Sequence, residues 1–156
     1  TLKNEYKAFG GEYTVIHHTE LIDELIESGK LVLKPESQGK MTFHDPCYLG
    51  RANNVYEAPR KALEVLDADL VELKRCKSNG LCCGAGGAQM FKEPEKGSQD
   101  INIKRSDEAI KTDSKIVAVS CPFCNTMMTD GVKYLDKQDD VEVLDLAEMI
   151  ANANDL

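Results

Sequence analysis

Cysteines are the residues in this sequence with the clearest capacity for chemistry, and five of the six fall into three groups. Cys47 stands alone, Cys82 and Cys83 are adjacent, and Cys121 and Cys124 form a Cys-x-x-Cys pair. The polar first residues predict that the chain carries no secretory signal, so we expect a reducing, cytoplasmic compartment. Grouped cysteines there bind metal or do redox chemistry more often than they form disulfides.

The number of grouped thiols favours a polynuclear centre. One tetrahedral zinc ion takes four ligands, fewer than the five grouped cysteines, whereas an iron–sulfur cluster offers several irons to neighbouring thiolates. Thiolates gathered in one pocket repel one another, and a bound metal removes that cost. Glycines at Gly84, Gly86 and Gly87 would let backbone amides approach an anionic group closely.

Other side chains that could ligate metal are predicted to be structural. Cys76 has no partner at a useful spacing and is expected to be a buried thiol. His17, His18 and His44 are expected to make structural hydrogen bonds. The adjacent methionines at 127 and 128 are expected to pack in the core.

Alternation of strand-like and helix-like segments predicts an α/β fold with a mostly parallel sheet and helices on its faces. Strands are expected at residues 13–16, 41–44, 70–73, 115–120 and 141–144. Helices are expected at residues 19–28, 58–66, 101–111, 121–134 and 146–151. Cys47 and Cys121 each follow a predicted strand, and the carboxyl ends of parallel strands form the usual ligand crevice, so the three groups can converge.

Charge and hydropathy exclude two classes of partner. The net charge is −8, and no run of basic residues forms the stripe that nucleic-acid binding requires. The longest apolar run, near residues 116–119, is far shorter than the roughly 20 residues that span a bilayer. We therefore predict neither nucleic-acid binding nor a membrane span in this chain.

These groups, together with their flanking residues, resemble the cysteine-rich CCG domain found in heterodisulfide reductase and its relatives, such as the iron–sulfur subunit of glycolate oxidase. Residues 44–51 (HDPCYLGR), residues 58–60 (APR) and residues 82–87 (CCGAGG) look like the bacterial iron–sulfur oxidoreductase branch. The resemblance covers about residues 40–150. Ala88 departs from it, because relatives tend to have a further glycine there.

The resemblance implies a Rossmann-like domain in which Cys47, Cys82, Cys83, Cys121 and Cys124 bind a 4Fe–4S cluster of non-cubane form. Relatives usually carry two such modules in tandem. Residues 1–26 and 126–151 share a faint common pattern, so residues 1–35 are predicted to be the tail of a preceding CCG-like module. Residues 36–156 are then the cluster-binding domain, the C-terminal module of a longer protein.

The function predicted from these observations is electron transfer within an iron–sulfur oxidoreductase. Other oxidoreductase subunits or electron carriers are the expected partners, with association to a membrane or a flavoprotein and a location in the cytoplasm or peripherally on the inner face of the membrane. Two alternatives stay open. One is a structural zinc module, and the other is a thiol–disulfide oxidoreductase that uses Cys121 and Cys124.

Overall fold

A parallel four-stranded sheet forms the centre of the computed structural model, which describes residues 1–34, 39–93 and 96–154. The strand order is β2-β1-β3-β4, and all neighbouring strands run parallel. The strands are β1 (Lys40–Phe43), β2 (Asp69–Leu70), β3 (Ile116–Val119) and β4 (Glu142–Asp145). The helices are α1 (His18–Glu27), α2 (Gly50–Asn53), α3 (Glu57–Val65), α4 (Ile101–Ile110), α5 (Pro122–Tyr134) and α6 (Leu146–Ala153). The predicted α/β fold with a parallel sheet is confirmed.

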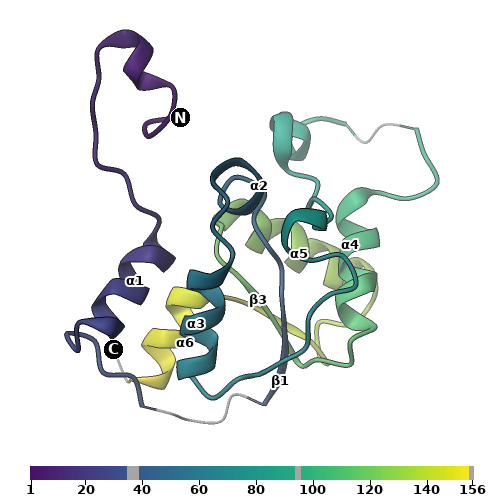
Figure 1. Cartoon of the computed structure of the whole chain (residues 1–156). Helices are drawn as coiled ribbons and strands as arrows, with labels where there is room; N and C mark the ends of the chain where they lie inside the picture. Colours follow the sequence, from purple (N-terminus) through teal and green to yellow (C-terminus); the bar gives the residue numbers. More distant parts are fainter. Residues whose placement is uncertain (35–38, 94–95, 155–156) are drawn as a thin grey trace.

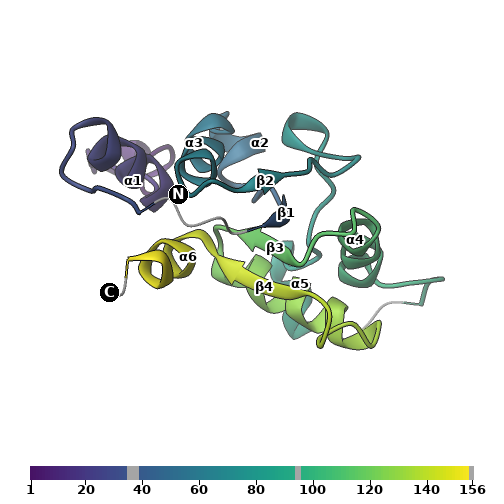
Figure 2. The same ribbon diagram turned by 90° about the horizontal axis from the view of Figure 1, so that it is seen from below.

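Helices cover both faces of the sheet, with α1 and α3 on one side and α4 and α5 on the other (Figure 2). The core on the first side joins β1 to α3 and α6 through residues such as Phe43, Leu63 and Met149. The core on the second side joins β3 to α5 through residues such as Val117, Val119 and Met128. Alternate residues of β3 enter different cores, as the pleat requires, so the apolar run at residues 116–119 is buried on both faces.

The chain order creates a switch point in the middle of the sheet. From β1 the chain crosses to β2 on one side, whereas β3 lies on the other side of β1 and leads outward to β4. Loops that leave the carboxyl ends of two central strands of this kind diverge and open a crevice between them. Here those strands are β1 and β3, the strands that precede Cys47 and Cys121.

The amino-terminal segment differs from the prediction. Residues 13–16 form no strand, and residues 1–17 run up and away from α1 (Figure 1). An apolar, β-branched segment becomes a strand only where a sheet edge supplies backbone partners, and none of the described strands pairs with it. A short 3-10 helix, Tyr6–Phe9, precedes it.

Helix α1 begins one residue before its predicted start, and its N-cap is His17. Nδ1 of His17 accepts a hydrogen bond from the amide of Thr19, and Glu20 accepts one from the amide of His17, which closes a capping box. The helix ends before Gly29, whose φ of +68° suits glycine. The predicted domain boundary between residues 35 and 36 lies outside the described residues.

Candidate metal centre

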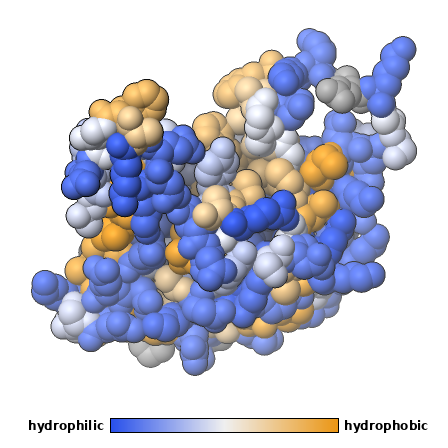
Figure 3. Space-filling view, turned by 45° about the horizontal axis from the view of Figure 1, so that its top comes forward, coloured by the Kyte–Doolittle hydropathy of each residue, from blue (hydrophilic) through white to orange (hydrophobic). Residues whose placement is uncertain are grey.

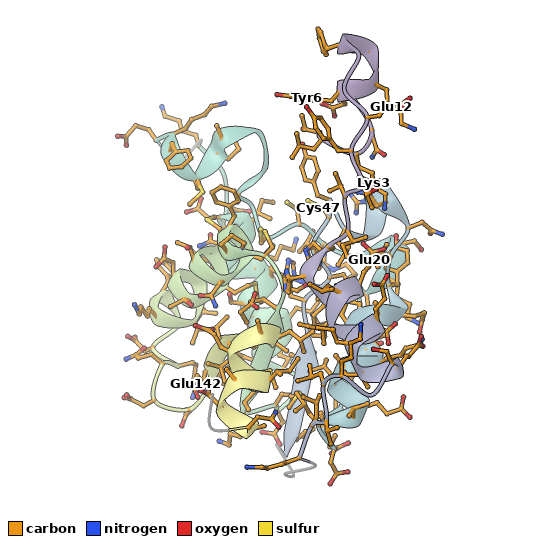
Figure 4. The ribbon with its side chains drawn as sticks, turned by 90° about the vertical axis from the view of Figure 1, so that its left-hand side faces the viewer. Lys3, Tyr6, Glu12, Glu20, Cys47 and Glu142 are labelled. Atoms are coloured by element: carbon orange, nitrogen blue, oxygen red, sulfur yellow. The ribbon has the colours of Figure 1, made fainter. Side chains whose placement is uncertain are left out.

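Three cysteine groups meet at the carboxyl end of the sheet. Figure 4 shows Cys47 near that end, whereas Glu142, at the start of β4, lies at the opposite end. Cys121 is the N-cap of α5 and follows β3 after one residue, with Pro122 in the first turn, where its missing amide donor costs nothing. The sheet therefore brings the first and third cysteine groups to its switch point.

Cys83 lies at the middle of the sulfur group. Its Sγ accepts a hydrogen bond from the thiol of Cys124 at 3.4 Å. Interactions with neighbouring thiols also shift the pKa values of Cys82 and Cys121. Cys83 and Cys124 are both buried in the second core, whereas Cys82 and Cys121 are partly exposed. Four of the five predicted ligands thus lie close enough to influence one another's ionisation.

Cys47 borders the same group through two cavities. A cavity of about 430 Å³ is lined by Cys47, Cys121 and Cys124 and is covered by residues of the amino-terminal segment, including Leu2 and Val15. A much smaller cavity brings Cys47 beside Cys82. Cys47 therefore lies next to the other four predicted cysteines, at the same end of the sheet.

Hydrogen bonding among the thiols divides them into acidic and weakly acidic groups. Donation from Cys124 and Cys82 holds the pKa of Cys83 well below its ordinary value, and burial does not offset this effect. The thiol of Cys124 and two backbone amides of the first helical turn lower the pKa of Cys121 to about 6. Donation to Cys83 raises the pKa of Cys82, and donation to Cys121 and Cys83 raises that of Cys124. The arrangement favours anionic sulfur at two positions before any metal binds.

Backbone amides of the glycine-rich loop point at these sulfurs. The amide of Gly84 donates to Sγ of Cys82 at 3.2 Å, and the amide of Ala85 donates to Cys83. Gly84 has a φ of +95°, which only glycine adopts readily. Ala88, where the sequence departs from its expected relatives, has a φ of +61°, so the further glycine they tend to carry would relieve backbone strain.

A buried ion-pair network holds the loop that carries Cys47. Arg60 donates to both oxygens of Asp45 at 2.8 and 3.0 Å and to both oxygens of Glu72 at 2.6 and 2.9 Å. Asp45 also accepts from the amide of Lys77. This network joins α3 to the loop that leads to Cys47 and to residues 72–77, which precede Cys82. The sequence alone did not reveal it.

The donor set fits a polynuclear iron–sulfur centre. Five cysteines from three segments lie at one end of the sheet, two of them in environments that favour the thiolate, and loop amides aim at the group. Such soft, anionic ligands with amide donors around them are the environment in which iron–sulfur clusters are held. One zinc ion would leave a thiol unused.

The other residues that the sequence analysis considered lie around the cysteines or in the core. Cys76 packs partly buried against the second core, and Met128 is fully buried. His17 caps α1, and Nε2 of His18 lies 3.6 Å from a carboxylate oxygen of Asp145. His44 is buried and hydrogen-bonded, and one of its ring nitrogens lies within 4.8 Å of the sulfurs of Cys83 and Cys124.

Apolar side chains are exposed beside the cysteines. Tyr48 follows Cys47 and is 70% exposed, and Phe123, within the Cys-x-x-Cys turn, is 52% exposed. Figure 3 shows apolar patches on the face that comes forward when the top of Figure 1 is turned toward the viewer. Within the described ranges, no helix has the length and apolar composition that crossing a bilayer would need.

Comparison with known proteins agrees with the geometry. The family model of the CCG cysteine-rich domain matches residues 41–129. The chain is 42% identical over 152 residues to the probable iron-sulfur-binding oxidoreductase FadF of Bacillus subtilis, a match that covers 97% of this chain and 21% of that protein. It is 40% identical over 158 residues to the EtfAB:quinone oxidoreductase of Syntrophomonas wolfei, with 97% and 22% covered.

A third relative is archaeal. One subunit of the dihydromethanophenazine:CoB–CoM heterodisulfide reductase of Methanosarcina barkeri is 34% identical over 142 residues, which cover 90% of this chain and 34% of that protein. The chain thus spans only about a fifth to a third of the length of these relatives. The match of the family model over more than half of the sequence shows that this chain belongs to the CCG cysteine-rich domain family.

Proposed function

We propose that this chain is an iron–sulfur-binding, electron-transferring part of a larger oxidoreductase. The observation that carries the proposal is the gathering of five cysteine sulfurs from three distant segments at the switch point of a parallel sheet. The names of the relatives, an iron–sulfur-binding oxidoreductase and a heterodisulfide reductase among them, support this choice over a zinc module.

The proposed ligands are Cys47, Cys82, Cys83, Cys121 and Cys124, and the proposed group is a 4Fe–4S cluster of non-cubane form. When bound, such a cluster would accept and release single electrons. The chain itself supplies thiolates, donates amide hydrogen bonds to them from Gly84 and Ala85, and buries Cys83 and Cys124 away from water. Simple electron transfer needs no acid–base pair.

Partners are proposed from the same comparisons. A relative named for a quinone and for EtfAB supports electron exchange with a flavoprotein and with a membrane-bound acceptor, and a further relative is named a probable membrane-anchored ferredoxin. We therefore propose that the module works on the cytoplasmic face of a membrane, with residues 1–35 as the tail of a preceding CCG-like module. The exposed Tyr48 and Phe123 would lie closest to an electron partner.

Iron and acid-labile sulfide analysis tests the proposal. The protein is reconstituted anaerobically, and the metal content and visible spectrum are measured. About four irons and four sulfides per chain, with an absorbance that reductant bleaches, are expected for a four-iron cluster. One zinc ion without sulfide would replace the proposal by the structural zinc module. Absence of metal, with a titratable Cys121–Cys124 pair, would replace it by the thiol–disulfide enzyme.

A further inference from the structure

An arginine is buried beside the metal centre and forms no bidentate pair with a carboxylate of the described residues. Arg105, on α4, is fully buried. Its Nε donates to Nδ1 of His44 at 2.9 Å, and its Nη1 donates to the carbonyl oxygen of Arg75 at 2.8 Å. The nearest carboxylate oxygen, from Glu108, lies 3.4 Å from Nη1. The guanidinium is therefore held by three groups, one of which is an imidazole ring.

The contact with Arg105 determines which nitrogen of His44 carries the proton. A guanidinium has donors only, so the Nδ1 atom that it contacts must be the unprotonated, accepting nitrogen. The ring is then neutral, with its hydrogen on Nε2.

Two sulfurs lie near the same ring. One ring nitrogen of His44 lies within 4.8 Å of the sulfurs of Cys83 and Cys124, and interaction with the imidazole lowers the pKa of the Cys83 thiol. The ring is only 1% exposed, so water cannot compete for its hydrogen. Because the hydrogen is on Nε2, His44 is the donor and the sulfur of Cys83 is the acceptor.

We propose that Arg105 and His44 form a relay that supplies an N–H donor to the Cys83 thiolate and thereby raises the reduction potential of the cluster. This inference rests on the proposed function and deepens it. Reduction adds negative charge to the cluster and its sulfurs, so a donor aimed at a ligand sulfur stabilises the reduced state more than the oxidised state. His44 is then a positioning residue rather than a ligand.

Potentiometric titration of two matched variants tests the relay. His44→Gln keeps an amide donor at about the position of Nε2, whereas His44→Asn keeps a group near Nδ1 that can accept from Arg105 but leaves Cys83 without a donor. We expect His44→Asn to lower the equilibrium constant for one-electron reduction about tenfold, which corresponds to about 59 mV. His44→Gln should stay within about threefold of the wild-type constant. Both variants should keep the wild-type iron and sulfide content.

A second readout does not depend on the cluster. Nitrogen-15 NMR of the metal-free protein should show His44 protonated at Nε2 and unprotonated at Nδ1. Replacement of Arg105 by methionine removes the donor to Nδ1 and should introduce the other tautomer. A wild-type ring protonated at Nδ1 would overturn the relay.

The other outcomes separate this inference from the function. If folded His44→Asn protein loses iron, His44 is a ligand, and the relay is wrong while the iron–sulfur function stands. Equal potentials in both variants and the wild type would also overturn the relay alone. Wild-type protein without iron and sulfide would overturn the proposed function, and the relay with it.

Discussion

The sulfur atoms of Cys83 and Cys124 lie 3.4 Å apart in the second core, although 41 positions separate the residues in the sequence. Because neither side chain can move far within a packed core, these sulfurs would be the first to react with each other in metal-free protein. We expect exposure of metal-free protein to air to produce a Cys83–Cys124 disulfide, detected by peptide mapping of the non-reduced protein.

The control for this cross-link is Cys76, which is only partly buried against the same core and should stay a free thiol. Bound iron should protect Cys83 and Cys124. A Cys121–Cys124 disulfide as the dominant product would instead show that the Cys-x-x-Cys turn is the more reactive pair.

Alanine substitutions should distinguish the five proposed cysteine ligands from the sixth cysteine, Cys76. Replacement of Cys47, Cys82, Cys83, Cys121 or Cys124 should lower bound iron and sulfide severely, because each loss leaves an iron without its thiolate. Cys76→Ala should retain the wild-type content, since that sulfur is no part of the group. Full iron content in Cys47→Ala would remove that residue from the proposed ligand set.

Loss of Arg60 should destabilise the fold strongly. Its guanidinium is 9% exposed and contacts Asp45, which is 5% exposed. Removing one partner leaves a buried, uncompensated charge, so Arg60→Met should lower the free energy of unfolding by about 3–5 kcal/mol. Urea unfolding followed by circular dichroism measures the change.

A matched control for Arg60 is Lys137→Met, which breaks the exposed pair with Asp140. Lys137→Met should change the free energy of unfolding little, because water screens exposed ion pairs. Similar losses for both variants would mean that the buried network contributes no more than a surface pair.

Gly131 permits close contact between α4 and α5. A methyl group at this position would lie 2.8 Å from the carbonyl oxygen of Asn102 and would overlap the hydroxyl oxygen of Ser106. Gly131→Ala should therefore lower the free energy of unfolding by about 1–3 kcal/mol, the usual cost of overpacking. Gly86→Ala is the control, because nothing lies within 4 Å of the added methyl group. Equal stability of Gly131→Ala and wild type would contradict the close packing.

Glu108 should make stability depend on pH in the acid range. Although burial acts to raise its pKa, donation from the side chain and amide of Arg75 holds the pKa of Glu108 below 4.5. A carboxyl whose pKa is lower in the folded state stabilises the fold above its unfolded pKa and loses that contribution as the pH falls through its folded pKa. Glu108→Gln should therefore be less stable than wild type at pH 7, and the difference should shrink below about pH 4.5.

The measurement is chemical unfolding at a series of pH values from neutral to about pH 3. Asp140→Asn, whose side chain is exposed, is the comparison and should change stability little across the series. A difference for Glu108→Gln that persists unchanged at the lowest pH would show that the contacts are lost for steric rather than ionic reasons.

Local sequence determined the elements and the cysteine groups. Local patterns predicted a strand at residues 115–120 and helices at residues 19–28 and 121–134, where the structure has β3, α1 and α5. These features depend on neighbours a few positions away, so periodicity and capping chemistry suffice to predict them. Residues 13–16 had the same local pattern and formed no strand, because a strand also needs a partner.

Tertiary structure decided which of these groups meet. The order β2-β1-β3-β4 places the loops after β1 and β3 at one switch point, and only that order joins Cys47 to Cys121. Arg105 and His44 lie 61 positions apart, and nothing in the local sequence of either residue indicates the other. The only local signal was an arginine on the buried side of α4, beside Ser106 and Ala109. Long-range contacts of this kind depend on how whole elements pack, which short-range spacing does not encode.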